Sequence, residues 1–138
     1  MTKAIFAALL GALFIGCTVT SNVQKSSAGA FENSSWVLVS ISDKSLNVQK
    51  APVIQFLDKK RVAGFNGVNS FGANYELSNS KIIFSNMIST RMASLSPELS
   101  KLEMDFTNTL LNANSFELNS VTLTISGANN TLIFKKTE

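Results

Sequence analysis

The sequence contains no histidine and only one cysteine, Cys17. Without histidine, neither a Ser-His-Asp triad nor a Cys-His pair can form, because both need an imidazole base. Zinc and other transition-metal sites also depend on imidazole and thiolate ligands, and the nine acidic residues show no calcium-loop spacing. The sequence therefore predicts a non-catalytic protein with no metal and no cofactor.

Carboxylates are the remaining source of acid and base chemistry. Glu103 and Asp105 lie two positions apart on a predicted helix, where their side chains point to different faces. Asp58 and Glu76 could meet across neighbouring strands as a glycosidase-like pair, although nothing in the sequence places them together. Catalysis by these carboxylates is the minor alternative.

A strong excess of positive charge is also missing. The 12 basic and 9 acidic residues leave a net charge of +3, and Lys59-Lys60-Arg61 is the one basic run. Nucleic-acid binders neutralise many phosphates and carry a basic stripe or recognition helix, so we expect no nucleic-acid partner. The basic run is expected to be a solvated turn, with contact to a lipid headgroup as the alternative.

Residues 1–16 resemble a signal peptide of the lipoprotein type. Their apolar run, from Ala4 to Ile15, is shorter than the roughly 20 residues of a membrane-spanning helix. The small residue and cysteine that follow resemble a bacterial lipobox, which implies that the thiol of Cys17 is diacylated and becomes the new amino terminus. Cleavage near Ala30 is the alternative, and it would leave a soluble periplasmic protein.

The residues after the cysteine predict location and domain boundaries. Thr18, rather than an aspartate, follows Cys17, which resembles the pattern of lipoproteins sent to the outer membrane. We therefore expect a bacterial envelope protein that faces the periplasm. Residues 17–33 are rich in Ser, Thr, Asn and small residues with no apolar period, so they are expected to be the lipidated cysteine and a flexible tether. Residues 34–138 are expected to form one domain.

Alternation of apolar and polar residues in this domain is typical of short strands. Strands are expected at residues 35–41, 53–57, 61–65, 68–77, 81–84, 115–118, 121–125 and 131–134. Asn66-Gly67 predicts a type I′ hairpin turn, and residues 87–93 are expected to be irregular chain across the barrel mouth.

One helix is expected at about 97–111. Ser96-Pro97-Glu98 supplies a capping hydroxyl, a proline where no amide donor is needed, and a carboxylate favoured by the helix dipole. The helix carries an apolar stripe at three- and four-residue steps, formed by Leu99, Leu102, Phe106 and Leu110. We expect this stripe to be buried against the sheet.

The chain between Arg61 and Ala93 carries a signature of glycine, aromatic and polar residues. It reads Gly64-Phe65-x-Gly67-x-Asn69-x-Phe71, then Tyr75, Met87 and Thr90-Arg91-Met92-Ala93. This wording resembles the META domain of HslJ-like bacterial envelope proteins, and the resemblance covers Ser34 to Lys136. With the pattern of strands and one helix, the resemblance implies an α+β fold, an antiparallel, partly closed β-barrel-like sheet packed by one α-helix.

The resemblance also implies a physiological context, and it reveals two positions where this chain differs from many relatives. The family is linked to the heat-shock response, novobiocin resistance and virulence, with no established reaction. Many relatives carry cysteine where this chain has Val68 and Ser94. If those cysteines form a disulfide in the relatives, this chain lacks a constraint worth roughly 2–4 kcal/mol and must replace it by packing.

Asn69 and Arg91 are the candidate binding residues, since each lies between apolar neighbours in the signature. In a structural role, Asn69 would bond to the backbone of the bent segment, and Arg91 would pair with Glu103, with Asp105 or with exposed carbonyls. In a binding role, both would line a mouth and hold an anionic headgroup or a partner's carboxylate. The sequence favours the structural role.

The leading functional hypothesis is a non-catalytic envelope protein, attached to the membrane through the lipid on Cys17. It would bind an unidentified envelope protein or act as a stress-tolerance module. The alternative is a small-barrel carrier, because ten phenylalanines could line an interior for a lipid or another hydrophobic ligand. The same phenylalanines would equally fill an ordinary core.

Overall fold

The computed structural model describes residues 28–138. The predicted signal peptide, Cys17 and the first part of the predicted tether lie outside these described residues. From Ala28 to the last residue, no helix combines the length and the hydropathy that crossing a membrane requires.

The described chain folds into one antiparallel sheet with one long helix. The strands are β1 Ser34–Ile41, β2 Lys44–Ser45, β3 Val53–Phe56, β4 Arg61–Phe65, β5 Ser70–Ser78, β6 Lys81–Ser89, β7 Ala113–Leu118, β8 Thr122–Gly127 and β9 Asn130–Lys136. The helices are α1 Ala28–Phe31 and α2 Pro97–Leu111. These elements confirm the predicted α+β class.

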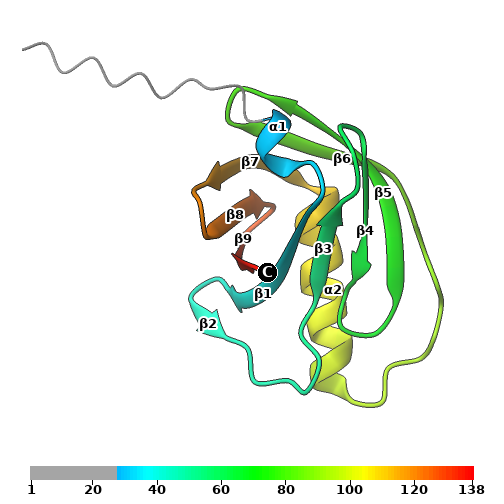
Figure 1. The fold of residues 1–138 in the computed structure, drawn as a ribbon. Helices are drawn as coiled ribbons and strands as arrows, with labels where there is room; N and C mark the ends of the chain where they lie inside the picture. Colours follow the sequence, from blue (N-terminus) through cyan, green and yellow to red (C-terminus); the bar gives the residue numbers. More distant parts are fainter. Residues whose placement is uncertain (1–27) are drawn as a thin grey trace, which may run out of the picture.

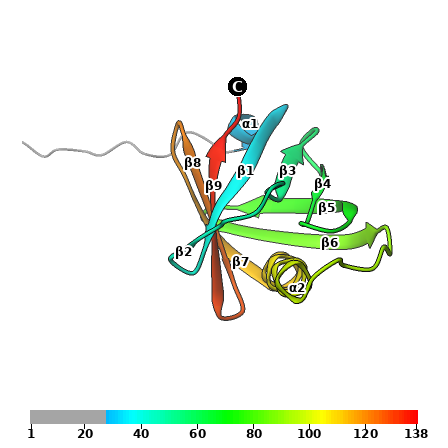
Figure 2. The ribbon, with the colours of Figure 1, turned by 90° about the horizontal axis from the view of Figure 1, so that it is seen from below.

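The sheet curls into a nearly closed barrel (Figure 1). Its strand order is β6-β5-β4-β3-β1-β9-β8-β7, and β2 pairs with β1 beside this path. β6 and β7 therefore form the two ends of the order, and the amide of Phe116 donates to the carbonyl of Ser80 between them, 2.9 Å away. Figure 2 shows α2 beside β6 and β7. α2 contacts β6 at one end of the strand order and β8 and β9 near the other end. The helix therefore covers the junction between β6 and β7, where strand pairing is incomplete.

α2 begins where the capping signal places it. The hydroxyl of Ser96 accepts a hydrogen bond from the amide of Leu99 at 3.2 Å, which satisfies one of the free donors of the first turn. Pro97 occupies the start of the helix, and Glu98 places a carboxylate in the first turn. The local sequence alone therefore fixes the start of this helix.

The apolar stripe of α2 is buried, as predicted. Leu102, Phe106 and Leu110 are buried against the sheet, whereas Leu99 is only half-buried. The ring of Phe106 meets Phe71 and Phe134 edge-on, with centroids 5.8 and 6.2 Å apart. These contacts join α2 to strands on both sides of the junction.

A cluster of four aromatic rings fills the end of the barrel that lies away from α2. The centroid of Phe31 is 4.6 Å from that of Phe56 and 5.2 Å from that of Phe116. Phe56 in turn meets Tyr75 at 4.9 Å, and these three pairs are edge-on. Each ring is buried, so side chains occupy the interior at this end.

The folded domain begins earlier than the predicted boundary at residue 34. α1 precedes that boundary, and Phe31 at its end is fully buried. The indole Nε1 of Trp36 donates to the hydroxyl of Ser34 at 2.8 Å, and this hydroxyl donates to the carbonyl of Phe31. One phenylalanine carries the packing, so the sequence shows no apolar period here. Residues 28–33, assigned to the tether, therefore belong to the folded part.

The predicted type I′ turn at Asn66-Gly67 is wrong. The turn between β4 and β5 is centred on Gly67 and Val68, and of these only Gly67 has a positive φ, 106°. The side-chain oxygen of Asn66 accepts the amides of Val68 and Asn69, at 3.1 and 2.7 Å. The side chain of Asn66 thus takes the part of a backbone carbonyl, which moves the turn by one residue.

The predicted irregular segment also differs from the structure at its start. Residues 87–89 complete β6, which continues to Ser89. Asn86 has a positive φ of 51°, and the register with β5 shifts between Gly72 and Asn74. This bulge breaks the alternation of side chains in the sequence, and so it hides the strand.

Phe31→Ala should lower the free energy of unfolding by about 3–5 kcal/mol, because it empties the centre of the aromatic cluster. Urea denaturation followed by the fluorescence of Trp36, the one tryptophan, measures this change. Leu95→Ala is the control, because Leu95 is 96% exposed and its loss should cost less than about 0.5 kcal/mol. Equal stability of the two variants would contradict the inclusion of α1 in the folded domain.

Candidate functional site

Most residues of the signature lie at or near one end of the barrel, which we call the signature end. It consists of the turn Asn66–Asn69, the start of α2, and the exit segment, residues 90–96, which leads from β6 to α2. Figure 1 shows α1 at the opposite end of β4 and β5. We call that opposite end, with α1 and the turn between β3 and β4, the α1 end.

Asn69 is the centre of the signature end. Its side-chain nitrogen donates to Glu103 Oε1 at 2.6 Å and to the carbonyl of Met92 at 3.3 Å. Its oxygen accepts the hydroxyl of Thr90 at 2.9 Å and the amide of Met92 at 2.7 Å. The side chain is 3% exposed, and these contacts use both ends of its amide. Asn69 therefore ties the turn, the exit segment and α2 together.

Two glycines of the signature stand where a side chain would not fit. A Cβ on Gly64 would lie 2.1 Å from the carbonyl oxygen of Val53 and 2.8 Å from the ring of Phe71. Gly67 has the positive φ of the turn and lies against Leu102 of α2. Both glycines thus permit close approach of β3, β4 and α2.

The aromatic and methionine residues of the signature have separate positions. Phe65 lies under the ammonium of Lys50, 4.2 Å from the ring centroid, and Met87 is half-buried against the core. Met92 is 62% exposed although its backbone is held by Asn69. Tyr75 belongs to the α1 end.

Arg91 lies on the exposed side of the exit segment. The structural role predicted an ion pair with Glu103 or Asp105, and among residues 28–138 Arg91 forms neither. Glu103 instead accepts a hydrogen bond from Asn69, and Asp105 pairs with Lys101 at 2.6 Å. The structure therefore brings Asn69 and Arg91 to the same end, with Asn69 turned inward and Arg91 outward.

An open depression of about 1010 Å³ lies at the α1 end. It is bounded by α1, the turn before β4, and the outer parts of β5 and β6, and its charged lining is Glu32, Asp58, Lys59, Lys60, Arg61 and Glu76. The structure therefore brings Asp58 and Glu76 to one surface feature, which the sequence left open. Across residues 28–138, no three acidic side chains are grouped so that they could hold a metal ion.

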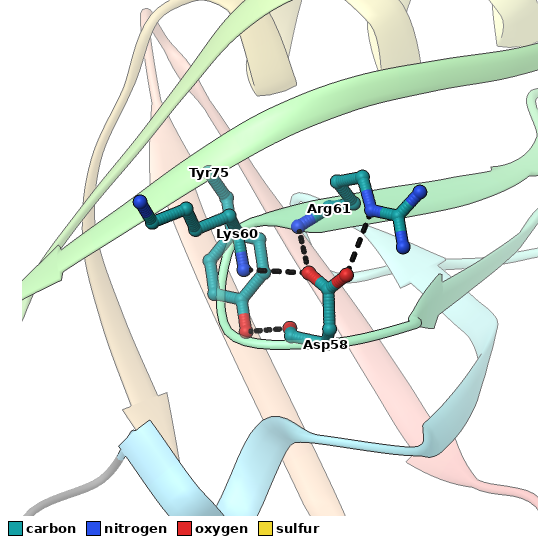
Figure 3. A network of polar contacts seen from close by, with 4 residues as sticks. All are labelled: Asp58, Lys60, Arg61 and Tyr75. Carbon is teal, nitrogen blue, oxygen red and sulfur yellow. Dashed lines mark hydrogen bonds and ion pairs between the residues drawn. The ribbon is translucent and has the colours of Figure 1, made fainter.

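In this depression, the carboxylate of Asp58 accepts hydrogen bonds that stabilise the turn between β3 and β4 (Figure 3). One carboxylate oxygen accepts the amides of Lys60 and Arg61 at 2.8 Å each, and the other accepts Arg61 Nε at 2.7 Å. These bonds, the one from the Lys60 amide above all, hold the pKa of the Asp58 carboxyl below its ordinary value. A carboxylate that stays ionised and has three donors is unsuited to be the general acid of a glycosidase-like pair.

Comparison with known protein families agrees with the described fold. The family model of the META domain matches residues 29–138. The chain belongs to the META domain family. The match confirms the resemblance carried by the signature, and it begins within α1, in agreement with the burial of Phe31. No protein with a curated description matches the chain.

Three solved structures resemble this META domain. One, solved by NMR, is 26% identical, with a TM-score of 0.67 over 78% of this chain and 92% of that one. Another NMR structure, of a protein from Burkholderia xenovorans, is 18% identical, with a TM-score of 0.64 over 99% and 98%. A crystal structure of a DUF4847 family protein from Bacteroides vulgatus ATCC 8482 is 11% identical, with a TM-score of 0.56 over 78% and 95%. The last two show likeness of fold alone.

Two members of the Asn69 network, Asn66 and Glu103, are not evident from the sequence. The side-chain nitrogen of Asn66 also donates to Glu103, at 3.3 Å, whereas the Asn-Gly pair in the sequence predicts only a turn residue. Glu103 was interpreted as a partner for Arg91. One signal was available: position 103 follows Leu99 by four and precedes Phe106 by three, so it borders the buried stripe of the helix. A carboxylate at that border needs a donor from the sheet side.

Asn69→Ala should lower the free energy of unfolding by about 2–4 kcal/mol, because it removes the Asn69 bonds of Thr90 and Met92 and leaves Glu103 with the longer bond from Asn66. Thermal unfolding of the variant, compared with Arg91→Ala, measures the effect. Arg91→Ala should change stability by less than about 0.5 kcal/mol, since the side chain is exposed. A loss confined to Arg91→Ala would reverse the roles assigned to the two residues.

Tyr75, the one tyrosine of the chain, should ionise only at high pH. Burial, aided by the charges of Glu32 and Asp58, raises its pKa to about 12 from the model-compound value of 10.0. Its contribution to stability is complete below pH 10 and is lost as the pH rises toward 12, because the unfolded chain releases the proton first. Phenolate absorbance measures this titration, with Trp36 fluorescence as the check on folding. A midpoint near 10 in folded protein would contradict the expectation.

Proposed function

We propose that this META domain is a non-catalytic binding module of the bacterial envelope. A lipid on Cys17 holds it on the periplasmic side, and Thr18 favours the outer membrane as its site. Its partner is another envelope protein, and its role is tolerance of envelope stress. The signal-like residues 1–16 and the setting implied by the family resemblance support this proposal.

The way the exit segment is held carries the proposal. Asn69 fixes its backbone, while Arg91 and Met92 extend from it and Leu95 is 96% exposed. Ile88, just before the segment, is 75% exposed. Arginine and methionine are enriched in protein interfaces, and a fixed backbone reduces the entropy lost on binding. These properties favour a protein partner at the signature end.

The packing of the interior favours a binding module over a carrier. Aromatic rings meet edge-on at the α1 end, and the stripe of α2 fills the region near Phe71 and Phe134. A carrier needs a preformed apolar cavity to take up an acyl chain. Here an acyl chain would have to displace Phe31 or Phe106, both of which are fully buried.

The chemistry of the described carboxylates supports a role without catalysis. Asp58 is engaged by three donors, and Glu103 by the two asparagines of the signature end. Both acids thus have structural duties, and the chain has no histidine to serve as base.

A photo-crosslinking residue at position 95 should capture an envelope protein in living cells. The same residue at position 114, which is exposed on β7 away from the exit segment, should not capture it. Cys17→Ala should abolish incorporation of a labelled fatty acid, move the protein from the membrane to the soluble fraction, and reduce the capture at position 95.

Two results would contradict the proposal. Equal capture at positions 95 and 114 would show that the signature end has no specific partner. A native mass spectrum with an acyl-chain mass beyond the covalent lipid, lost on denaturation, would favour the carrier.

A further inference from the structure

β6 lies at the end of the strand order, and among the described strands it pairs only with β5. Near the end of β6, the amide of Thr90 donates to the carbonyl of Ser70 at 3.0 Å, in the direction of β5. In an antiparallel pair, residues that bond to the neighbouring strand alternate with residues that do not. The amide and carbonyl of Ser89, the residue before Thr90, therefore face away from β5. We call this side of the chain the free edge.

Asn69 continues the same alternation beyond the strand. The amide of Met92 donates to the side-chain oxygen of Asn69 at 2.7 Å, and the carbonyl of Met92 accepts from its side-chain nitrogen at 3.3 Å. The Asn69 side chain thus takes the place of a further residue of the neighbouring strand. Arg91 lies between Thr90 and Met92, so its backbone groups face the free edge. Across residues 28–138, no backbone bond outside the β5–β6 pairing involves Ser89 or Arg91.

The free edge is open to solvent. Ile88 and Ser89 point to opposite faces of β6, and both are exposed, Ile88 to 75%. Nearer the start of the strand, by contrast, Ile82 and Phe84 are buried. Figure 1 shows the chain passing from β6 to α2 along the outside of the barrel. A further strand could therefore reach this edge without displacing part of the core.

Arg91 gives the free edge a positive charge. It is the one charged residue between Phe84 and Glu98, and within residues 28–138 it forms no ion pair. The same edge of a second copy carries no carboxylate, and neither do residues 17–27 of this chain. A charge on an edge strand deters pairing between identical edges. The free edge therefore suits an acidic segment of a different protein, whose carboxylate the guanidinium can bind through two hydrogen bonds.

We propose that an extended, acidic segment of the envelope partner adds to β6 as a further strand. Its backbone pairs with Ser89 and Arg91, one of its carboxylates binds the guanidinium of Arg91, and an apolar side chain contacts Ile88. In this mode of recognition, main-chain bonds supply affinity and side-chain contacts supply specificity. The inference rests on the proposed binding function and names the chemistry and the binding mode of the partner.

Residue-resolved hydrogen exchange of the full chain, with synthetic peptides as probes, tests the proposal. The peptide acetyl-Thr-Val-Glu-Val-Thr-amide, at millimolar concentration, should slow exchange of the Ser89 and Arg91 amides several-fold. The amides of Thr90 and Met92 should change little, because they already have acceptors. Two control peptides should protect none of these amides. One has lysine in place of glutamate, and the other keeps the glutamate but has every amide N-methylated, so that it cannot donate to the edge.

Matched variants separate strand addition from attraction of charge. Arg91→Glu should reverse the preference, so that the lysine peptide protects the edge and the glutamate peptide does not. Ser89→Pro removes a donor of the free edge and should abolish the protection at Arg91. Ser120→Pro, in the exposed turn between β7 and β8, is the matched control and should leave the protection intact. Thermal unfolding confirms that each variant is folded, and Arg91→Glu decides the question if Ser89→Pro is not.

Several results would overturn the inference. Equal protection by the glutamate and N-methylated peptides, equal protection by the glutamate and lysine peptides, a gain that does not alternate along residues 89–92, or no protection would each exclude strand addition. Crosslinking at position 95 in cells is read separately. Failure to capture any protein there would refute the binding function, whereas capture that is unchanged in folded Ser89→Pro or in Arg91→Glu would refute only the added strand.

Discussion

The incomplete junction between β6 and β7 is the constraint on which this META domain depends. One backbone bond, from Phe116 of β7 to Ser80, the residue before β6, links the ends of the sheet order in the described chain. Edge groups that no strand satisfies are costly when they face a core. α2 must therefore lie beside the junction. Its buried stripe supplies apolar contact, but the stripe alone does not fix the helix against the sheet. The hydrogen bonds of Glu103 with Asn66 and Asn69 add that fixed point.

This requirement explains which features could be predicted from the sequence. The helix at 97–111 and most strands follow from local signals, a capping serine with proline and the alternation of apolar residues, and the structure confirms them. The Asn69–Glu103 contact joins residues 34 positions apart, and no local rule specifies such a pair. Phe31 was missed for a related reason, because its partners lie on β3, β5 and β7. Contacts between distant segments, not element types, limited the prediction.

The two ends of the barrel differ in where their polar side chains point and what they bond to. At the signature end, the polar side chains of the turn and of α2 face inward and bond to one another, which leaves Arg91 and apolar side chains outside. At the α1 end, Asp58 organises a turn whose remaining charges point into solvent. The α1 end thus presents exposed charges, and the signature end presents a fixed, partly apolar segment.

The same geometry bears on the absence of cysteine at positions 68 and 94 of this chain. The resemblance places cysteine in many relatives at the positions of Val68 and Ser94, and these positions flank the contacts of Asn69 with Thr90 and Met92. A disulfide there would join the turn to the exit segment, which the Asn69 side chain already joins through three hydrogen bonds to Thr90 and Met92. Each such bond contributes roughly 1 kcal/mol, so together they approach the constraint of a disulfide, roughly 2–4 kcal/mol. The buried amide of Asn69 therefore holds the exit segment to the turn without a covalent link.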